Sequence, residues 1–529
     1  MRQNRELVVE QSQLGARAGR NTISDALSRA DRRFGNRTAL SFAGRNWSFS
    51  GLVHAADRVA TRLKSAGVQP GGRVAAYGRN SDAFLILWLA CVRAGFIHVP
   101  LNYALVGREL SYILGNSDPS ALFADPDIEG RAREALGGQS RLQLVGTFAG
   151  EADFDILRTA QDASLAISAE LGQQVRDEDV VQLLYTSGTT AAPKGAMMTH
   201  RALLAEYGSC IIELGFRDTD RCLAALPLYH SAQMHVFTMP QLLVGAATLL
   251  IDAPQPEVCL RLIEEHRISS FFAPPTVWIG LLRSGDFEQR NLSSLQHVFY
   301  GASIMPVPVL AELRARLPGA QPFNCYGQSE IGPLATVLRP EEHEKRPASA
   351  GRPIFNVETR VVDGDMNDAP PGTRGEIVHR SPQLLTGYWR EPELSQEAFA
   401  GGWFHSGDVG IADEEGYITI VDRVKDIIKT GGTIVASREV EEEIFTHPAV
   451  REVAVVGLPH PKWIEAVTAF VVLRDAEQAS EEDILEHVRT TLAPFKQPKR
   501  VVFVPEVPRN TAGKILKRDL RQTHSGLYA

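Results

Sequence analysis

The chain has 529 residues, too many to fold around one hydrophobic core, so its length predicts at least two domains. A hydrophobic content of 44% and a charged content of 22% are ordinary for a soluble globular protein. The net charge of −8 argues against a nucleic-acid-binding protein, so a phosphate-bearing ligand would have to meet local cationic groups rather than a basic surface.

The N-terminal residues Met1 to Glu6 lack the apolar segment of a signal peptide, and the longest apolar run, Ala83 to Val92, is too short to span a bilayer. The cysteines are odd in number, scattered and without a Cys-x-x-Cys pair: Cys91, Cys210, Cys222, Cys259 and Cys325. This usage predicts reduced thiols that fill the core rather than bind a metal. We therefore expect a cytoplasmic protein with no integral membrane contact.

Residues 20–150 alternate short apolar runs with helical patterns. Strands are predicted over 74–77 and 97–99, and helices over 82–94 and 107–115. Such alternation is typical of an α/β fold whose strands are covered on both faces.

A loop rich in hydroxyl groups follows the next predicted strand, Val180 to Leu184, and precedes a helix that Thr199 can cap. Glycine and small hydroxyl residues let backbone N–H groups converge on an anion, and Lys194 adds a point charge. The sequence therefore predicts a cradle for a polyphosphate. Its residues are Thr186, Ser187, Gly188, Thr189, Thr190 and Lys194.

The loop is not a Walker A motif, because Pro193 precedes Lys194 and Gly195 follows it. Residues 185–195, Tyr-Thr-Ser-Gly-Thr-Thr-Ala-Ala-Pro-Lys-Gly, instead resemble the phosphate loop of the acyl-adenylate-forming superfamily. That superfamily comprises acyl-CoA synthetases, luciferases and the adenylation domains of peptide synthetases. Ala191 departs from its pattern, where glycine is usual. For this loop alone, a Ser/Thr-rich turn with an exposed lysine is the alternative.

The segment Leu226-Pro227-Leu228-Tyr229-His230 ends a predicted strand and turns. It is similar to the family segment that places an aromatic residue or a histidine beside the carboxylate substrate, which gives His230 a catalytic role; alone, it would be a structural histidine. Ser231 stands where amino-acid-activating relatives carry an acidic residue. The resemblance therefore favours a plain carboxylic acid as substrate.

The segment 324–330, Asn-Cys-Tyr-Gly-Gln-Ser-Glu, resembles the family pattern Tyr-Gly-x-Thr-Glu, with Ser329 in place of threonine. Tyr326 offers a flat face for a purine, and Glu330 offers a hard oxygen ligand for Mg²⁺. Standing alone, the segment would be a turn with a solvated glutamate. The resemblance implies a nucleotide site with Ser303, Asn324, Tyr326, Gly327 and Ser329, a metal site with Glu330 and Thr186, and an acyl pocket with His230, Gly301, Ala302 and Gly332.

Two further segments match the family in order. Residues 402–408 are similar to its Trp-x-x-Thr-Gly-Asp pattern, which implies that Asp408 accepts hydrogen bonds from the two ribose hydroxyls. Residues 421–432 look like the family's interdomain linker, in which Arg423 would contact the ribose and Lys425 would be the hinge. Gly431 and Gly432 follow, and they would let the backbone approach the pantetheine arm of coenzyme A closely.

The C-terminal part carries its own strand and helix patterns, which suffice for a small α+β domain. Helices are predicted over 437–446 and 480–493, and strands over 451–457, 467–473 and 500–504. Pro508 to Leu516 resembles the family's Pro-[Arg/Lys]-x-x-x-Gly-Lys motif. Lys514 would then bridge the attacking carboxylate and the α-phosphate as charge builds.

The resemblance covers residues 20–520 with five motifs in the family's order. It implies an α/β fold with a large multi-layer N-terminal domain, 1–422, a hinge, 423–425, and a small mobile α+β domain, 426–529. The implied enzyme is an ATP-dependent acyl-CoA synthetase that uses Mg²⁺. It forms an acyl-adenylate from a carboxylic acid and transfers the acyl group to coenzyme A.

Two departures from the family pattern leave alternatives open. Ala191 in the phosphate loop would affect how the site holds pyrophosphate. Thr433-Ile434 stands where many CoA synthetases carry Glu-Asn and would affect thiolation. An enzyme that only thioesterifies a preformed acyl-adenylate is therefore the second reading, and a nucleotide-binding scaffold without activity is a third. Luciferase and peptide-synthetase roles stay open on fold. The sequence does not identify the acid. It also leaves the oligomeric state open, and a homo-oligomer is one of the options.

Overall fold

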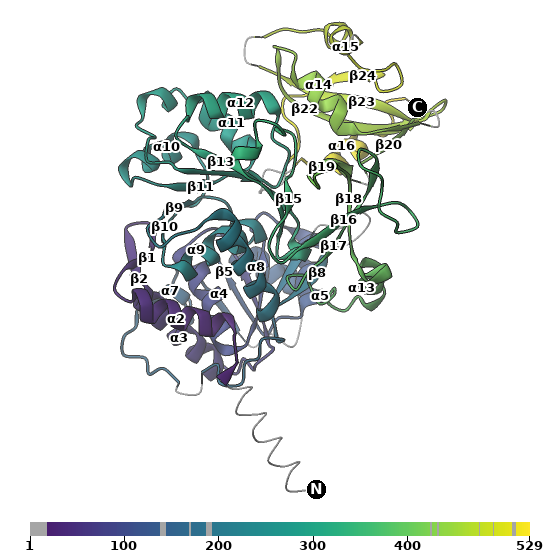
Figure 1. The fold of residues 1–529 in the computed structure, drawn as a ribbon. Helices are drawn as coiled ribbons and strands as arrows, with labels where there is room; N and C mark the ends of the chain where they lie inside the picture. The colour runs from purple at the N-terminus through teal and green to yellow at the C-terminus, as the bar shows by residue number, and fades with distance from the viewer. Residues whose placement is uncertain are drawn as a thin grey trace.

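The computed structural model describes residues 18–137, 144–168, 171–186, 193–423, 426–430, 433–474, 477–489, 491–509 and 515–528. Two large sheets with helices form the body of the protein, and a third sheet lies between this body and the C-terminal sheet (Figure 1). The α/β class expected from the alternating patterns is confirmed.

The first large sheet has six strands in the order β6-β5-β3-β4-β7-β8. Its strands are β3 (Arg73–Tyr77), β4 (Ile97–Leu101), β5 (Ala121–Ala124), β6 (Leu144–Thr147), β7 (Val180–Thr186) and β8 (Lys194–Thr199). The pairs are parallel except β7 and β8, which form an antiparallel hairpin. Every residue of β4 and β5 is buried, as parallel strands covered on both faces should be.

The second large sheet has nine strands in the order β15-β14-β13-β12-β11-β9-β10-β1-β2. Its strands are β1 (Thr38–Phe42), β2 (Arg45–Ser48), β9 (Arg221–Ala224), β10 (Ala247–Leu250), β11 (Ser270–Phe272), β12 (His297–Gly301), β13 (Gln321–Gly327), β14 (Leu334–Leu338) and β15 (Arg352–Pro353). Its central strands β10, β9, β11, β12 and β13 pair in parallel, so their carboxyl ends lie at one edge.

Helices cover these sheets. They are α2 (Ile23–Phe34), α3 (Phe49–Ser65), α4 (Asp82–Ala94), α5 (Gly107–Ser117), α6 (Glu129–Leu136), α7 (Ile156–Gln161), α8 (His200–Leu214), α9 (Met239–Val244), α10 (Pro256–Glu265), α11 (Pro275–Arg283) and α12 (Val307–Arg316), with a π-helix at Ala232–Thr238 and 3₁₀ turns at Phe287–Gln289, Ser329–Ile331 and Pro340–Glu342. The strands and helices predicted between residues 74 and 115 are all confirmed.

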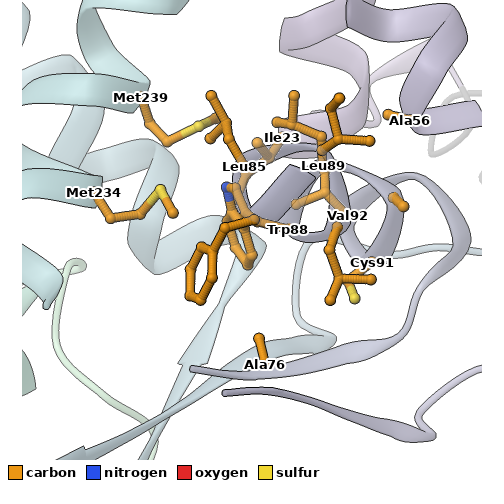
Figure 2. Close-up of a cluster of buried hydrophobic side chains, with 14 of the residues drawn as sticks. Ile23, Ala56, Ala76, Leu85, Trp88, Leu89, Cys91, Val92, Met234 and Met239 are labelled. Atoms are coloured by element: carbon orange, nitrogen blue, oxygen red, sulfur yellow. The ribbon is translucent and has the colours of Figure 1, made fainter. Parts of the chain in front are cut away.

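Helix α4 lies at the centre of the main core. It is apolar on nearly all sides, and Trp88 and Leu89 are fully buried. Figure 2 shows Trp88 between side chains of α4, Met234 and Met239, with Ile23 nearby. This packing joins the first sheet to the segment after β9.

The third sheet is antiparallel, with β16 (Glu358–Val362), β17 (Arg374–Arg380), β18 (Phe404–Ala412) and β19 (Ile418–Arg423) in chain order. The loop between β17 and β18 contains α13 (Pro392–Ala398) and a 3₁₀ turn at Ala400–Gly402. Strand β19 ends at Arg423, the first residue of the predicted hinge; Val424 and Lys425 lie outside the described residues.

The C-terminal part is a five-stranded sheet with helices. Its elements are β20 (Ile428–Thr430), β21 (Thr433–Val435), α14 (Ser437–Phe445), β22 (Val450–His460), β23 (Ile464–Leu473), α15 (Glu481–Arg489), β24 (Arg500–Phe503) and α16 (Lys517–Thr523). The helix predicted over 480–493 is too long, since α15 ends at Arg489 and residues 491 and 492 turn. Pro494 explains part of this, because a residue before proline disfavours the helical conformation. The division into two domains stays a prediction.

Among the described segments, none of the helices has the length and hydrophobicity needed to cross a membrane.

Candidate active site

The β7–β8 hairpin holds the two ends of the predicted phosphate cradle. Strand β7 ends at Thr186 and β8 begins at Lys194, and these two residues face each other in the antiparallel register. Thr199 caps α8 as predicted, since its hydroxyl accepts from the backbone N–H of Ala202 at 3.1 Å. The predicted residues between the strands lie outside the described residues: Ser187, Gly188, Thr189 and Thr190, together with Ala191.

Glu330 lies in the 3₁₀ turn after β13 and is only 8% exposed. Its Oε1 accepts hydrogen bonds from the Thr186 hydroxyl at 3.0 Å and from the Tyr388 hydroxyl at 3.3 Å. Two predicted metal ligands that are 144 residues apart in the chain therefore meet where the β7–β8 hairpin enters its connecting loop. The Nζ of Lys194 lies 5.3 Å from the centre of the Tyr388 ring, a cation–π contact.

Tyr388 was missed by sequence reasoning, although it contacts both Glu330 and Lys194. Burial, reinforced by the Glu330 carboxylate, raises the pKa of the Tyr388 hydroxyl. Tyr388 therefore stays a neutral donor near neutral pH, and its hydrogen bond helps to orient the Glu330 side chain. The only sequence signal is an aromatic pair, Tyr388-Trp389, after a glycine.

Glu330 and Thr186 offer one carboxylate and one hydroxyl to a metal. Among the described residues, no group of three or more histidine, cysteine, aspartate or glutamate side chains could hold an ion. Mg²⁺ is usually held by one or two carboxylates together with substrate phosphates and waters, rather than by an all-protein cage. This donor set therefore fits Mg²⁺ that enters with a nucleotide.

A second cluster joins β13, β18 and β19. Asp408 accepts a hydrogen bond from the Tyr326 hydroxyl at 2.8 Å and forms an ion pair with Arg423 at 2.9 Å. Its backbone N–H donates to the Ser406 hydroxyl at 3.0 Å, and it is 4% exposed. An ionised carboxylate has about four acceptor positions, so two would remain for the hydroxyls of a ribose.

Electrostatics stabilise this cluster. Burial raises the pKa of the Tyr326 hydroxyl, and Asp408 raises it further, so Tyr326 stays neutral. Burial disfavours the charge of Arg423, but Asp408 together with Tyr326, Glu330 and Asp426 outweighs burial and raises the pKa of the guanidinium. Asp408 and Arg423 also face each other in the register of β18 and β19, which aligns their side chains. Three residues predicted from three separate segments thus form one unit.

The ends of β12 and β13 bring the predicted acyl and adenine residues together. A Cβ on Gly301 would lie 2.1 Å from the Cys325 carbonyl oxygen, and one on Gly327 would lie 1.9 Å from that of Pro333, so both positions require glycine. Ala302 is exposed and takes a φ of 62°, unusual for a residue with a side chain.

The remaining predicted residues of this edge lie nearby. Ser303 follows β12 and is half-buried, and Asn324 donates its amide to the Ser349 carbonyl at 2.8 Å. The Ser231 and Ser329 hydroxyls lie 2.7 Å apart. This contact puts the turn that carries His230 beside Ser329, a residue of the predicted nucleotide site.

The other predicted residues lie outside the described residues: Lys425, Gly431, Gly432 and Lys514. The segment that follows Lys514 is anchored by Lys517 of α16, whose Nζ donates to the Ser437 hydroxyl at 2.5 Å and pairs with Glu441 at 2.8 Å. Ser437 in turn donates from its N–H and its hydroxyl to Asp422, both at 2.7 Å.

This network adjoins the predicted hinge, since Asp422 belongs to β19. Burial opposes the charge of Lys517, but Glu441 and Asp422 raise its pKa, so the buried ammonium stays charged. Sequence reasoning missed the network. Lysine, aspartate and serine at these positions look like ordinary solvated residues in the sequence.

Sequence comparison extends these observations. Residues 27–389 match the family described as "AMP-binding enzyme", and residues 439–514 match "AMP-binding enzyme C-terminal domain". The chain is 35% identical to a feruloyl-CoA synthase of an Amycolatopsis species over 485 residues, which cover 92% of this chain and 95% of that protein. It is 31% identical to the indoleacetate–CoA ligase of Aromatoleum aromaticum, with the same two coverages.

Solved structures agree in fold. ATP-bound MatB from Rhodopseudomonas palustris superposes with a TM-score of 0.86 at 31% identity, over 96% of this chain and all of that chain. The anthranilate CoA ligase AuaEII, in complex with anthranoyl-AMP, gives a TM-score of 0.88 at 27% identity, over 95% of this chain and 97% of that chain. The similarity therefore covers nearly the whole length.

Proposed function

Because the chain belongs to the AMP-binding enzymes, the acyl-adenylate-forming superfamily, we propose that it is an acyl-CoA synthetase that activates a carboxylic acid with ATP and transfers the acyl group to coenzyme A. The observation that carries the proposal is the hydrogen bond between Thr186 and Glu330 beside the loop of the β7–β8 hairpin, with Lys194 next to them. Relatives named as CoA ligases support the same class.

In the first step, a carboxylate oxygen of the acid attacks the α-phosphorus of ATP, and the bond to pyrophosphate breaks. Two anions have to meet, so the site needs positive charge. Lys194 would neutralise the departing pyrophosphate, and Lys514 would lie between the carboxylate and the α-phosphate. Glu330 and Thr186 would hold Mg²⁺ with the nucleotide, and the ion would supply charge neutralisation on the phosphates.

The nucleoside would be held by the second cluster. Asp408 and Arg423 would bind the ribose, and the ring of Tyr326 would pack against the adenine. Because Asp408 is already hydrogen-bonded to Tyr326 and paired with Arg423, these groups would be in place before ATP binds. Ser329 would donate to the α-phosphate, oriented by Ser231.

In the second step, the thiol of coenzyme A loses its proton and attacks the acyl carbonyl, and AMP leaves with the oxygen of the mixed anhydride. We propose that residues 426–529 rotate about the hinge at 423–425 between the two steps. Lys514 would withdraw, and Gly431 and Gly432 would face the pantetheine arm. The thiolation-only alternative is not favoured, since these relatives are named as CoA synthases or CoA ligases.

The test separates the steps. Wild-type protein is offered a panel of short, long, aromatic and polycyclic acids, and acid-dependent exchange of pyrophosphate into ATP is measured beside CoA-thioester formation. Lys514→Ala should lose exchange by at least about a hundredfold, because a charge at the attack point is removed. The same variant should convert supplied acyl-adenylate to thioester within about threefold of wild type.

Equal loss of both steps in Lys514→Ala would contradict the division of roles. Thioester formation from acyl-adenylates alone, with no exchange for any acid, would instead establish the thiolation-only enzyme. No product in either assay would refute the proposed function.

A further inference from the structure

The turn that carries Glu330 has little internal support. Within it, Ile331 N–H donates to the Gln328 carbonyl at 2.9 Å, and Gly332 N–H donates to the Ser329 carbonyl at 3.3 Å. Gly332 takes a φ of 105°, which lies in the left-handed region. Two local hydrogen bonds cannot by themselves fix a six-residue turn, so the position of the Glu330 carboxylate must be set from outside.

Gln383 supplies much of that support. Its side chain is fully buried, and its Nε2 lies 3.1 Å from the Ile331 carbonyl oxygen and 2.9 Å from the Leu334 carbonyl oxygen. Its Oε1 accepts from the Ser209 hydroxyl at 2.7 Å. Two residues later, the Leu385 N–H donates to the Glu330 carbonyl at 2.8 Å. One short segment thus bonds three carbonyls of the turn.

Glu206 of α8 binds the backbone N–H of Leu334, at the end of the turn. Its Oε1 accepts from the Leu334 N–H at 2.9 Å and from the Cys210 thiol at 3.2 Å, and its Oε2 accepts from Gln383. It is fully buried, and every one of these partners is neutral. Both backbone groups of Leu334 are therefore held by side chains, one by Glu206 and one by Gln383.

We propose that Gln383 and Glu206 are positioning residues that hold the turn 329–334, so that Glu330 keeps its contact with Thr186 and the site binds a magnesium–nucleotide complex. The inference rests on the proposed function for the identity of that ligand. It assigns no contact with substrate to either residue. Their effect passes through the backbone of the turn to the Glu330 carboxylate.

The charge on Glu206 does not decide this role. Gln383 has two N–H hydrogens and three acceptors within reach, namely Ile331, Leu334 and Glu206. Gln383 can therefore bond both carbonyls of the turn whether or not Glu206 accepts. Glu206→Gln keeps an oxygen for the Leu334 N–H, whereas Glu206→Met removes it. These two variants separate the hydrogen bond from the volume of the side chain.

The experiment compares Gln383→Met with the matched control Gln241→Met. Gln241 is also buried, at 3% exposure, and donates to the Ser270 hydroxyl at 3.2 Å, away from the turn. Binding of ATP with Mg²⁺ and binding of AMP without Mg²⁺ are measured by calorimetry. The Mg²⁺ dependence of pyrophosphate exchange is measured on the same samples.

Gln383→Met should weaken binding of ATP with Mg²⁺ by about tenfold and raise the half-saturating Mg²⁺ concentration by a similar factor, as for the loss of one or two hydrogen bonds. AMP binding should change by less than about twofold, and Gln241→Met should match wild type in both. Glu206→Met should behave like Gln383→Met, and Glu206→Gln should restore Mg²⁺ dependence to within about threefold of wild type.

Equal loss of AMP and ATP binding in Gln383→Met would show general damage to the site and overturn the proposal, as would a wild-type response to Mg²⁺. If Gln383→Met does not fold, Glu206→Met and Glu206→Gln are compared in the same binding and Mg²⁺ measurements. Failure of the proposed function would be seen separately, as absence of exchange and thioester formation in wild type. The calorimetric comparison would still decide the positioning role.

Discussion

Glu206→Gln should change the pH dependence of stability, and this prediction does not depend on the reaction. Burial raises the pKa of Glu206 from 4.5 to about 8, against the hydrogen bonds from Leu334 and Cys210, which lower it. The folded protein therefore keeps the proton over a range where the unfolded chain has lost it. The stabilisation is complete below pH 4.5 and is lost as the pH rises toward 8.

The size of the effect follows from linkage. Between pH 5.5 and 7.5 the folded state binds about one proton more than the unfolded state at this site, so stability falls by about 1.4 kcal/mol per pH unit. The loss over this range is about 2 to 3 kcal/mol. Glutamine does not titrate, so the variant should escape that loss. For a chain of 529 residues the difference is about 2 to 3 °C in melting temperature.

The assay is thermal unfolding of wild type and Glu206→Gln in parallel at pH 5.5, 6.5 and 7.5. Other titrations are common to both proteins and cancel in the difference, as does any constant cost of the amide. The melting temperature of the variant should rise relative to wild type at each step. Glu134→Gln, at an exposed carboxyl of α6, serves as the control and should give a constant difference. A constant difference for Glu206→Gln as well would refute the reasoning.

Two further predictions concern the other clusters. Asp408→Asn removes the charge that faces Arg423 and leaves one oxygen for Tyr326 and Arg423 to share, so AMP affinity should fall by at least about tenfold in calorimetry; unchanged affinity would exclude Asp408 from the nucleotide site. Lys517→Met leaves Glu441 and Asp422 without their buried cation, a loss of about 3 to 5 kcal/mol. Its melting temperature should fall by several degrees, whereas the exposed Lys462→Met should stay near wild type, and equal shifts would argue against the buried network.

The sequence predicts the fold well where local patterns are strong. Helix α4 is apolar almost throughout and begins after Ser81, whose hydroxyl accepts from the Phe84 N–H at 3.0 Å. The strands around it are buried on both faces and appear as short apolar runs. The prediction for helix α15 is too long, because Leu492 continues the apolar spacing of Ile484 and Val488 past Arg489, while Pro494 lies ahead. Helix ends depend on such local competition.

The candidate site was predicted from motifs, and its supports were not. Glu206 falls on the buried face of α8, in step with Leu203, Tyr207 and Cys210, so helical spacing could have identified it as a buried carboxyl. Nothing in the sequence could have named its two distant partners, Leu334 and Gln383, because they lie more than a hundred residues away. Pairings over such separations are set by tertiary packing.

The segment from Gln383 to Trp389 contacts both parts of the phosphate site, namely the strand that begins at Lys194 and the turn that carries Glu330. Shortly after Gln383, Thr386 and Trp389 donate from their N–H groups to the carbonyls of Met197 and Gly195 in β8, at 3.0 and 2.8 Å. The segment is therefore fixed to the strand that begins at Lys194. Since its other contacts hold the turn of Glu330, a shift of the segment would carry the lysine strand and the carboxylate turn together. A metal–phosphate site depends on the distance between these groups, and a shared support preserves that distance better than separate supports could.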